Sequence, residues 1–489
     1  MASHTQLFID GALVPAHGAQ DLPVTDSYTE ETFGTYRTAS PADVHAAVAA
    51  ARRALDGWAR TPVAERVAAV RRVAAALRDQ ADALASAISR EVGMPRKLAA
   101  RIQVGAPLAA WDMYADLAAH FEWASRVGHS LVQQVPVGVV ACITPWNYPL
   151  HQITGKVAPA LLAGCTVVLK PSEIAPTSAF LLAEAVRQAG LPAGVFNLVH
   201  GAGPDIGEAL VRHPDVDMVS FTGSTRAGRH IASLAGADIK RVALELGGKS
   251  AALVLPGADL AAAVKATLAG CMLNSGQTCS ATTRLLVPRA SLEAVEGLAL
   301  DLLAGYRMGD PADAATRLGP LVSKPQQQKV QDLIDSAIAA GAKRLGTAAE
   351  RPAQGFFVPA TVLTGVTSDM AVAREEIFGP VLVLIAYDDV EQGIALANGT
   401  DYGLAGAVWG PVEPQTLAVA RRIRAGQVDI NGAPFNPAAP FGGFKKSGIG
   451  RENGRFGLEE FLEPVSIQLP AAFLEHPASF CSSSSSSSS

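Results

Sequence analysis

Beyond residue 130 the chain repeats one local pattern, in which a short run of β-branched and other apolar residues is followed by a turn and then by a stretch with helical spacing. Strand-forming runs that alternate with helices are typical of a doubly wound, largely parallel sheet. The pattern occurs in two series, with candidate strands at 137–143, 166–169, 195–199 and 218–221, and then at 251–255, 284–287, 381–386 and 406–409. The sequence therefore predicts an α/β fold with two doubly wound units.

The segment 41–90 is rich in alanine and has apolar residues at helical spacing, which predicts long amphipathic helices. A chain of 489 residues, 49% of them hydrophobic, is long enough to bury the cores of two or three domains. No long linker and no repeat of fixed period separates the two strand series. We therefore expect a tight boundary near Gly247 and Gly248, with the active site in the cleft between the units.

The formal net charge is -5, and acidic and basic residues are interspersed. This distribution offers no basic stripe for nucleic acid and no polybasic segment for an anionic membrane. Residues 1–10 lack the charged and apolar regions of a signal peptide, and no uninterrupted apolar run is long enough to span a bilayer. We therefore expect a cytoplasmic protein with neither a nucleic acid nor a membrane partner.

The five cysteines are an odd number spread over a long chain, so they do not form a disulfide framework. Cys142, Cys165 and Cys271 lie among apolar residues and are expected to be inert core thiols. Cys481 adjoins a run of serines that resembles a tag, a linker or a disordered tail. Cys279 differs from the others because of its neighbours.

Two short stretches carry the chemistry: Leu-Glu-Leu-Gly-Gly-Lys-Ser, which contains Glu245, and Asn-Ser-Gly-Gln-Thr-Cys, which ends at Cys279. Cysteine attacks an aldehyde carbon readily near neutral pH, and a nearby carboxylate can later deprotonate the water that releases the thioester. The pair therefore predicts oxidation of an aldehyde to an acid.

These stretches, together with the string Pro145-Trp146-Asn147-Tyr148-Pro149, resemble motifs of the aldehyde dehydrogenase superfamily. The resemblance covers roughly residues 7–469 and implies an NAD(P)-dependent enzyme whose substrate is a small-molecule aldehyde. Glu245 matches the base of the non-acylating, hydrolytic branch, so the product should be a free carboxylic acid.

The resemblance also implies an architecture of two doubly wound domains, one Rossmann-like for the cofactor and one catalytic, with a small β element for oligomerisation. We therefore expect a homodimer or a homotetramer. The implied ranges are 1–120 and 136–247 for the cofactor domain, 248–461 for the catalytic domain, 121–135 and 462–475 for the oligomerisation element, and 476–489 for a disordered tail.

Five residues have implied catalytic roles. Asn147 and the backbone N–H of Cys279 would stabilise the oxyanion that forms when the thiolate adds to the carbonyl. Lys156 and Glu452 match positions that relay protons toward Glu245. The alternative is that these two residues only form surface salt bridges. A reactive Cys279 thiol of low pKa is expected of such an enzyme.

Two stretches match the part of the family's site that binds the adenosine and pyrophosphate groups. Lys170 and Glu173 follow a predicted strand and would hold the adenosine ribose. The Glu173 carboxylate would repel a 2′-phosphate, which favours NAD, while Lys170 leaves NADP open. Gly223, Ser224 and Gly228 join a strand to a helix whose first N–H groups would face the pyrophosphate.

The nicotinamide end of the cofactor would be bound by residues from both units. Glu376 would hold the nicotinamide ribose and Phe378 would support the ring. Leu246 and Gly247 would supply backbone contacts, with Trp146 beside them. These roles are all implied by the resemblance.

The substrate pocket is expected to involve Tyr148, Phe435, Thr278 and Ser280. Gly155 replaces a large aromatic residue found at this position in some relatives. A roomier pocket follows, which favours a medium, bulky or aromatic aldehyde over acetaldehyde.

No arginine is an obvious anchor for a second carboxylate on the substrate, although Arg101 and Arg284 are candidates. Arg451 and Glu463 are expected to form a structural ion pair. No metal site is predicted, because the histidines are scattered and no paired C-x-x-C spacing is present.

Two other functions fit the same residues. The chain would be a non-catalytic binding or structural protein if the fold were kept without the chemistry, but Cys279, Glu245 and Asn147 are all intact. It would be an esterase if Cys279 acted without a cofactor, which would leave Glu376 and the loop at Gly223 without a purpose.

Overall fold

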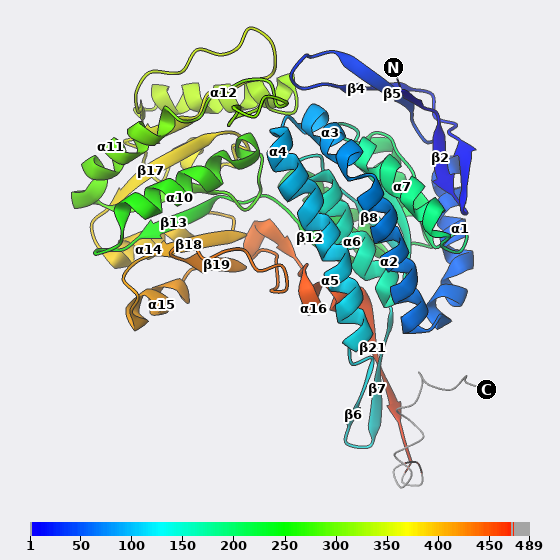
Figure 1. Cartoon of the computed structure of the whole chain (residues 1–489). Coiled ribbons are helices and arrows are strands. Elements are labelled where there is room, and N and C mark those ends of the chain that lie inside the picture. Colours follow the sequence, from blue (N-terminus) through cyan, green and yellow to red (C-terminus); the bar gives the residue numbers. More distant parts are fainter. Residues whose placement is uncertain (1, 471–472, 474–489) are drawn as a thin grey trace.

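Two large sheets form the body of the molecule (Figure 1). The computed structural model describes residues 2–470 and residue 473, so the tail predicted at 476–489 lies outside the described residues. The α/β class and the long helices predicted in segment 41–90 are confirmed.

The first sheet has eight strands in the order β20-β12-β11-β8-β9-β10-β2-β3. The strands from β12 to β10 run parallel, and the others join them antiparallel at the edges. The first predicted strand series is confirmed here, whereas the edge strands and β12 were not predicted. The strands are β2 (Gln6–Ile9), β3 (Ala12–Pro15), β8 (Val139–Ile143), β9 (Thr166–Lys170), β10 (Phe196–Leu198), β11 (Met218–Thr222), β12 (Arg241–Glu245) and β20 (Gly448–Ile449).

Both faces of this sheet are buried. Along β8, Val140 and Cys142 enter one apolar cluster while Val139 and Ala141 enter another, as expected for a strand covered on both sides. One face packs against α1 (Pro41–Arg60), α8 (Glu208–Arg212) and α9 (Thr225–Ala237). The other packs against α2 (Val63–Asp79), α3 (Ala81–Val92), α5 (Ala106–His120), α6 (Pro149–Ala163) and α7 (Thr177–Ala189).

The second sheet has seven strands in the order β15-β16-β17-β14-β13-β18-β19, all parallel except β15. The second predicted strand series is confirmed here. The strands are β13 (Ser250–Val254), β14 (Thr282–Pro288), β15 (Lys343–Arg344), β16 (Thr361–Thr364), β17 (Val381–Tyr387), β18 (Ala405–Trp409) and β19 (Gln427–Ile430). The covering helices are α10 (Leu260–Met272) and α11 (Leu292–Leu303) on one face, and α12 (Lys324–Ala339), α13 (Ala371–Arg374), α14 (Val390–Asn398) and α15 (Pro414–Ala420) on the other.

Two small sheets complete the fold. The two ranges predicted for the small β element, 121–135 and 462–475, contribute strands to one three-stranded sheet, in which β7 lies between its partners and which projects at the bottom of Figure 1. Its strands are β6 (Ala124–Val127), β7 (Ser130–Pro136) and β21 (Leu462–Gln468). The other sheet consists of β1 (Ala2–His4), β4 (Asp21–Thr25) and β5 (Thr32–Arg37).

Residues 246–249 connect the two large sheets, because β12 ends at Glu245 and β13 begins at Ser250. The chain later returns to the first sheet, where β20 pairs with β12 and sets Gly448 opposite Glu245. The short helix α16 (Gly454–Glu459) follows and contacts α5 and α6. The segment 441–459 is thereby held beside the connection between the sheets.

The predicted ion pair between Arg451 and Glu463 is wrong. Glu463 binds Arg241, with 2.8 Å between Oε1 and Nη1. The Arg451 guanidinium instead donates to the carbonyl oxygens of Gly443 and Gly450. Glu463 lies on β21, and that strand's antiparallel pairing with β7 directs its side chain toward β12 rather than toward Arg451.

None of the described helices is both long enough and apolar enough to span a membrane.

Candidate functional site

A cavity with about 640 Å³ of empty space, part of it open to solvent, lies where the two large sheets meet. Its walls come from loops at the carboxyl ends of parallel strands, the usual position of ligand sites in open α/β sheets. The first unit contributes Trp146, Asn147, Gly223, Ser224, Leu246 and Gly247, and the second contributes Cys279, Lys329, Glu376 and Phe378. The structure therefore brings together residues of five separate predicted motifs.

The loop before Cys279 has an unusual backbone. Asn274, Ser275 and Gly276 have φ angles of 52°, 55° and 77°, all in the left-handed region. This region is rare for residues with a side chain, and the first two residues store about 1–3 kcal/mol each. A Cβ at Gly276 would lie 2.0 Å from the carbonyl oxygen of Gly379, so only glycine fits.

Asn147 and the same loop hold each other in place. The Asn147 amide Nδ2 donates to the carbonyl oxygen of Gln277 (3.1 Å), and Asn274 Nδ2 donates back to the carbonyl oxygen of Asn147 (2.9 Å). A side-chain amide has two N–H groups, so one remains for a ligand in the cavity that Asn147 lines. This geometry suits the predicted oxyanion donor.

Cys279 keeps partial solvent access, whereas Cys142, Cys165 and Cys271 are fully buried, as predicted for inert core thiols. Burial raises the pKa of the Cys279 thiol, and the nearby carboxyl groups of Glu245 and Glu376 raise it further. The expected low pKa is wrong, because the surroundings disfavour the thiolate. A base must therefore take the thiol proton when the nucleophile is used.

Glu245 is the last residue of β12 and is only 5% exposed. Neither of its carboxyl oxygens has a hydrogen-bond partner among the described residues. Burial raises its pKa well above the usual value, and the charge of Glu452 adds to this shift. Gly442 makes room for the carboxyl group, because a Cβ there would lie 2.6 Å from Glu245 Oε1.

Lys156 and Glu452 form an ion pair between Nζ and Oε1. Their side chains are 1% and 15% exposed, so the alternative of a surface salt bridge is wrong. The Lys156 and Glu452 charges act in opposite directions on the pKa of Glu245, which ties this pair to the candidate base.

The Glu376 carboxyl group lies directly on the connection between the sheets. The Gly248 N–H donates to Glu376 Oε1 (3.1 Å), and a Cβ at Gly247 would lie 2.4 Å from Oε2. Phe378 meets Trp146 edge to face, with 5.4 Å between the ring centroids. A carboxylate and two aromatic rings in one cavity fit a ribose and a flat heterocycle.

The loop at Gly223 fits a phosphate group. Ser224 caps α9, its Oγ accepting from the backbone N–H of Ala227 (3.2 Å). The N-terminus of this helix attracts anions. The hydroxyl of Thr222, which lines the cavity, is buried without a hydrogen-bond partner among the described residues, which leaves one donor for a ligand.

Gly228 allows α9 to approach the connection between the sheets. A Cβ there would lie 2.4 Å from Leu246 Cδ2. Lys170 is 3% exposed and lies 3.5 Å from Glu173, which is 44% exposed. Glu173 is therefore free to accept hydrogen bonds from ribose hydroxyls, with Lys170 buried beneath it.

The predicted substrate residues divide into two groups. The hydroxyls of Tyr148 and Thr278 are hydrogen-bonded at 2.8 Å, and Thr278, Cys279 and Ser280 are all partly exposed. Phe435 is 48% exposed on a surface loop, where its ring meets Phe441 at 6.2 Å. Tyr148 is thus beside the nucleophile, while Phe435 lies at the surface.

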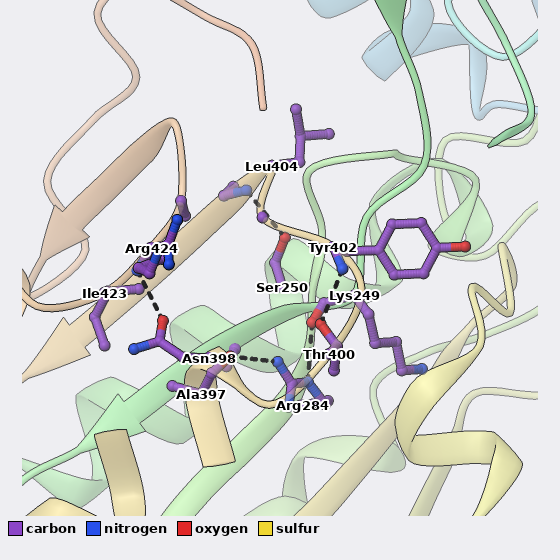
Figure 2. A pocket seen from close by; sticks show the side chains of 14 residues that line it. Lys249, Ser250, Arg284, Ala397, Asn398, Thr400, Tyr402, Leu404, Ile423 and Arg424 are labelled. Carbon is purple, nitrogen blue, oxygen red and sulfur yellow. Dashed lines mark hydrogen bonds between the residues drawn. The ribbon is translucent and has the colours of Figure 1, made fainter. Parts of the chain in front are cut away.

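Arg284 does not serve as a substrate anchor. Its guanidinium donates to the carbonyl oxygens of Lys249, Leu396 and Ala397 at 2.9, 2.7 and 2.8 Å. Figure 2 shows it beside Lys249 in a separate pocket of the second unit. Arg101, the other candidate, is exposed on a π-helical turn.

Two lysines near the cavity were missed by the sequence analysis. Lys329 lines it and donates to the backbone oxygen of Glu376 (2.9 Å). Lys249 Nζ is buried without a hydrogen-bond partner among the described residues, and burial lowers its pKa to about 7. Lys249 belongs to the Glu245 motif and could have been noted there, whereas nothing near Lys329 in the sequence indicates its position.

Known proteins resemble this chain over almost its full length. The model of the aldehyde dehydrogenase family matches residues 13–467. A 3-succinoylsemialdehyde-pyridine dehydrogenase from Pseudomonas sp is 45% identical, over 95% of this chain and 98% of its own length.

Two solved structures give the same result. A mutant of aldehyde dehydrogenase C from Pseudomonas syringae, complexed with NAD+ and octanal, is 45% identical with a TM-score of 0.93, covering 95% of this chain and 96% of that one. An aldehyde dehydrogenase from Mycobacterium tuberculosis, complexed with NAD+, is 39% identical with a TM-score of 0.93, covering 96% and 99%.

Proposed function

This chain belongs to the aldehyde dehydrogenase family, and on that premise we propose that it oxidises an aldehyde to the free carboxylic acid, with NAD as hydride acceptor and Cys279 as nucleophile. The observation that carries this proposal is the cavity between the sheets. It joins Cys279 and Asn147 to Glu376 and Phe378, so a nucleophile, an oxyanion donor and groups suited to a nucleotide share one space.

In the first step the Cys279 thiol loses its proton and sulfur adds to the aldehyde carbon. Glu245, whose carboxyl oxygens have no partner among the described residues and whose charge acts on the pKa of Cys279, would take this proton. Asn147 Nδ2 and the Cys279 backbone N–H then donate to the new oxyanion. Such a donor typically contributes a factor of about 10² to 10³ in rate.

NAD, when bound, supplies the acceptor for the hydride that leaves the thiohemiacetal carbon. Glu376 would hold the nicotinamide ribose, and Phe378, whose ring meets Trp146 edge to face, would support the nicotinamide ring. The N-terminus of α9, with Ser224 as its cap, would hold the pyrophosphate. Glu173 would accept from the adenosine ribose.

The thioester is then hydrolysed. Glu245 in its ionised form takes a proton from water, which attacks the acyl carbon and releases Cys279 and the acid. The charge of Glu452, which is paired with Lys156, raises the pKa of Glu245. Glu452 would pass the proton onward. Because the pKa of Glu245 is raised, hydrolysis should accelerate as pH rises.

The substrate is a medium-sized, bulky or aromatic aldehyde. Gly155, two turns beyond Tyr148 on α6, is partly exposed and has no side chain to fill this position. Of the two relatives that are 45% identical, one is named for a pyridine semialdehyde and the other was solved in complex with octanal. Neither compound is a very small aldehyde.

We also propose that the small sheet supports a homo-oligomer. Val465 and Ile467 are two positions apart on β21, so they share one face of this sheet, and each is 41% exposed. Exposed apolar side chains that cluster on one projecting sheet are typical of a protein interface.

The test is the absorbance of reduced nicotinamide with NAD and a panel from acetaldehyde through hexanal, benzaldehyde and indole acetaldehyde to succinic semialdehyde. We expect reduction with the larger neutral aldehydes and none with the Cys279→Ala variant. Failure of every aldehyde with folded protein would refute the proposed function. Calorimetry with NAD would then separate a non-catalytic NAD-binding protein from a protein that binds no nucleotide.

A further inference from the structure

Helix α6 is buried at every position except His151 and Gly155. These residues are four apart and therefore lie on the same face of the helix. A helix packed on all other sides keeps solvent access at one spot only where a recess reaches it. Solvent therefore reaches α6 along the His151–Gly155 face.

This face begins at the nucleophile. The Tyr148 hydroxyl is hydrogen-bonded to Thr278, the residue before Cys279, and the Tyr148 ring lies 6.4 Å from the His151 ring. Cys279 is itself partly exposed. The partly exposed positions thus run from Cys279 past Tyr148 to His151 and Gly155, and an aldehyde bound at Cys279 would extend along them.

At Gly155, which is partly exposed, a carboxylate lies against the helix. A Cβ added there would lie 3.3 Å from Glu452 Oε2 and 3.8 Å from Glu452 Cδ, and outside α6 only Glu452 comes within 4 Å. Glu452 Oε1 is taken by Lys156, whereas Oε2 has no hydrogen bond within the described chain. The missing side chain at Gly155 therefore both enlarges the pocket and uncovers a hydrogen-bond acceptor.

His151 adds a second polar group to the recess. Its ring makes an aromatic contact with Tyr148 and no hydrogen bond with any described residue. Burial lowers its pKa, so the ring is neutral near pH 7 when no ligand is bound. A neutral imidazole still offers one donor and one acceptor.

We propose that Glu452 Oε2 and the His151 ring form a polar subsite in the aldehyde recess, which selects aldehydes bearing a hydroxyl or amine donor and rejects aldehydes bearing a carboxylate. The inference rests on the proposed function and narrows its substrate class. A donor would pair with Oε2, which is otherwise left without a partner. A carboxylate would meet Glu452 Oε2, an acceptor whose charge Lys156 only partly offsets, and would bring no donor to it, which is unfavourable.

The test uses three benzaldehydes of similar size that carry a methyl, hydroxymethyl or carboxyl group at the para position, with kcat/KM measured for each. For the unmodified enzyme we expect the order hydroxymethyl, methyl, carboxyl, with the carboxyl compound at least about tenfold below the methyl compound. Equal values within about twofold for all three would overturn the proposal.

Glu452→Gln keeps the shape of the side chain and removes its charge. Ratios between substrates within one variant cancel any loss that all substrates share, including a slower proton transfer. We expect the carboxyl-to-methyl ratio to rise at least about tenfold in this variant. His151→Leu should reduce the hydroxymethyl preference, while His151→Gln, which keeps a donor and an acceptor, should retain it. Unchanged ratios in Glu452→Gln and His151→Leu would overturn the subsite.

A failure of the proposed function is distinguishable. If no aldehyde supports NAD reduction, calorimetry of the same three compounds with the Cys279→Ala variant still ranks them as ligands. The order hydroxymethyl, methyl, carboxyl would support the subsite, and any other order would refute it.

Discussion

Replacement of Lys156 by methionine tests the buried ion pair beside the candidate base. Methionine keeps most of the side-chain volume but leaves the Glu452 carboxylate without its partner. Removing one member of a buried pair typically costs about 3–5 kcal/mol. Lys156 is 1% exposed, but Glu452 is 15% exposed and faces the recess, so we expect the lower end, about 3 kcal/mol.

The chain supplies a matched control for this change. Arg455 and Glu459 form an exposed pair one helical turn apart, with side chains 62% and 38% exposed. Arg455→Met should cost no more than about 0.5 kcal/mol. Urea unfolding followed by tryptophan fluorescence gives the free energy of unfolding of both variants.

The double variant Lys156→Met with Glu452→Leu should recover most of the lost stability, because an apolar pair of similar volume leaves no uncompensated charge. The single variant Lys156→Met also removes a cation that lowers the pKa of Glu245, so the pH profile of thioester hydrolysis should move to higher pH. A loss for Lys156→Met no larger than that for Arg455→Met would refute the reasoning.

Three other changes test the site. Asn147→Ala should lower kcat/KM by about 10² to 10³ without weakening NAD binding by calorimetry, and a similar loss of NAD binding would contradict an oxyanion role. The folded pKa of Glu245 is raised above 4.5, so its stabilising contribution is present below that pH and is lost as pH rises. The stability of Glu245→Gln relative to the unmodified protein should therefore grow as pH rises above 4.5, and a pH-independent difference in urea unfolding would argue against a protonated buried carboxyl. Gly276→Ala forces a Cβ to 2.0 Å from a backbone oxygen, so reaction of Cys279 with a thiol reagent should change markedly, and an unaltered rate would show that the loop tolerates the clash.

Much of the fold could be read from local patterns. Residues 166–169 became β9 and residues 381–386 became most of β17, because a short β-branched run bounded by turns folds into a strand wherever it is buried on both faces. The candidate site was likewise visible in local motifs, since the turn that follows a parallel strand places its residues at one edge of the sheet. Trp146, Ser224 and Leu246 all reach the same cavity for that reason.

Contacts between distant segments depended on the folded chain. Nothing local to Glu452 indicates that it would pair with Lys156 on α6, or that Glu463 would bind Arg241 rather than Arg451. Those partners are set by the return of β20 to the first sheet and by the pairing of β21 with β7.

The protonation of the site also belongs to the folded chain. The raised pKa values of Cys279 and Glu245 arise from burial and from carboxyl groups brought near by other segments. Residue types and their spacing in the sequence identify the nucleophile and the base, because the ability to act as either is a property of a single side chain. The charge that each group bears depends on its dielectric surroundings and its neighbours, and these exist only when the two sheets have closed around the cavity.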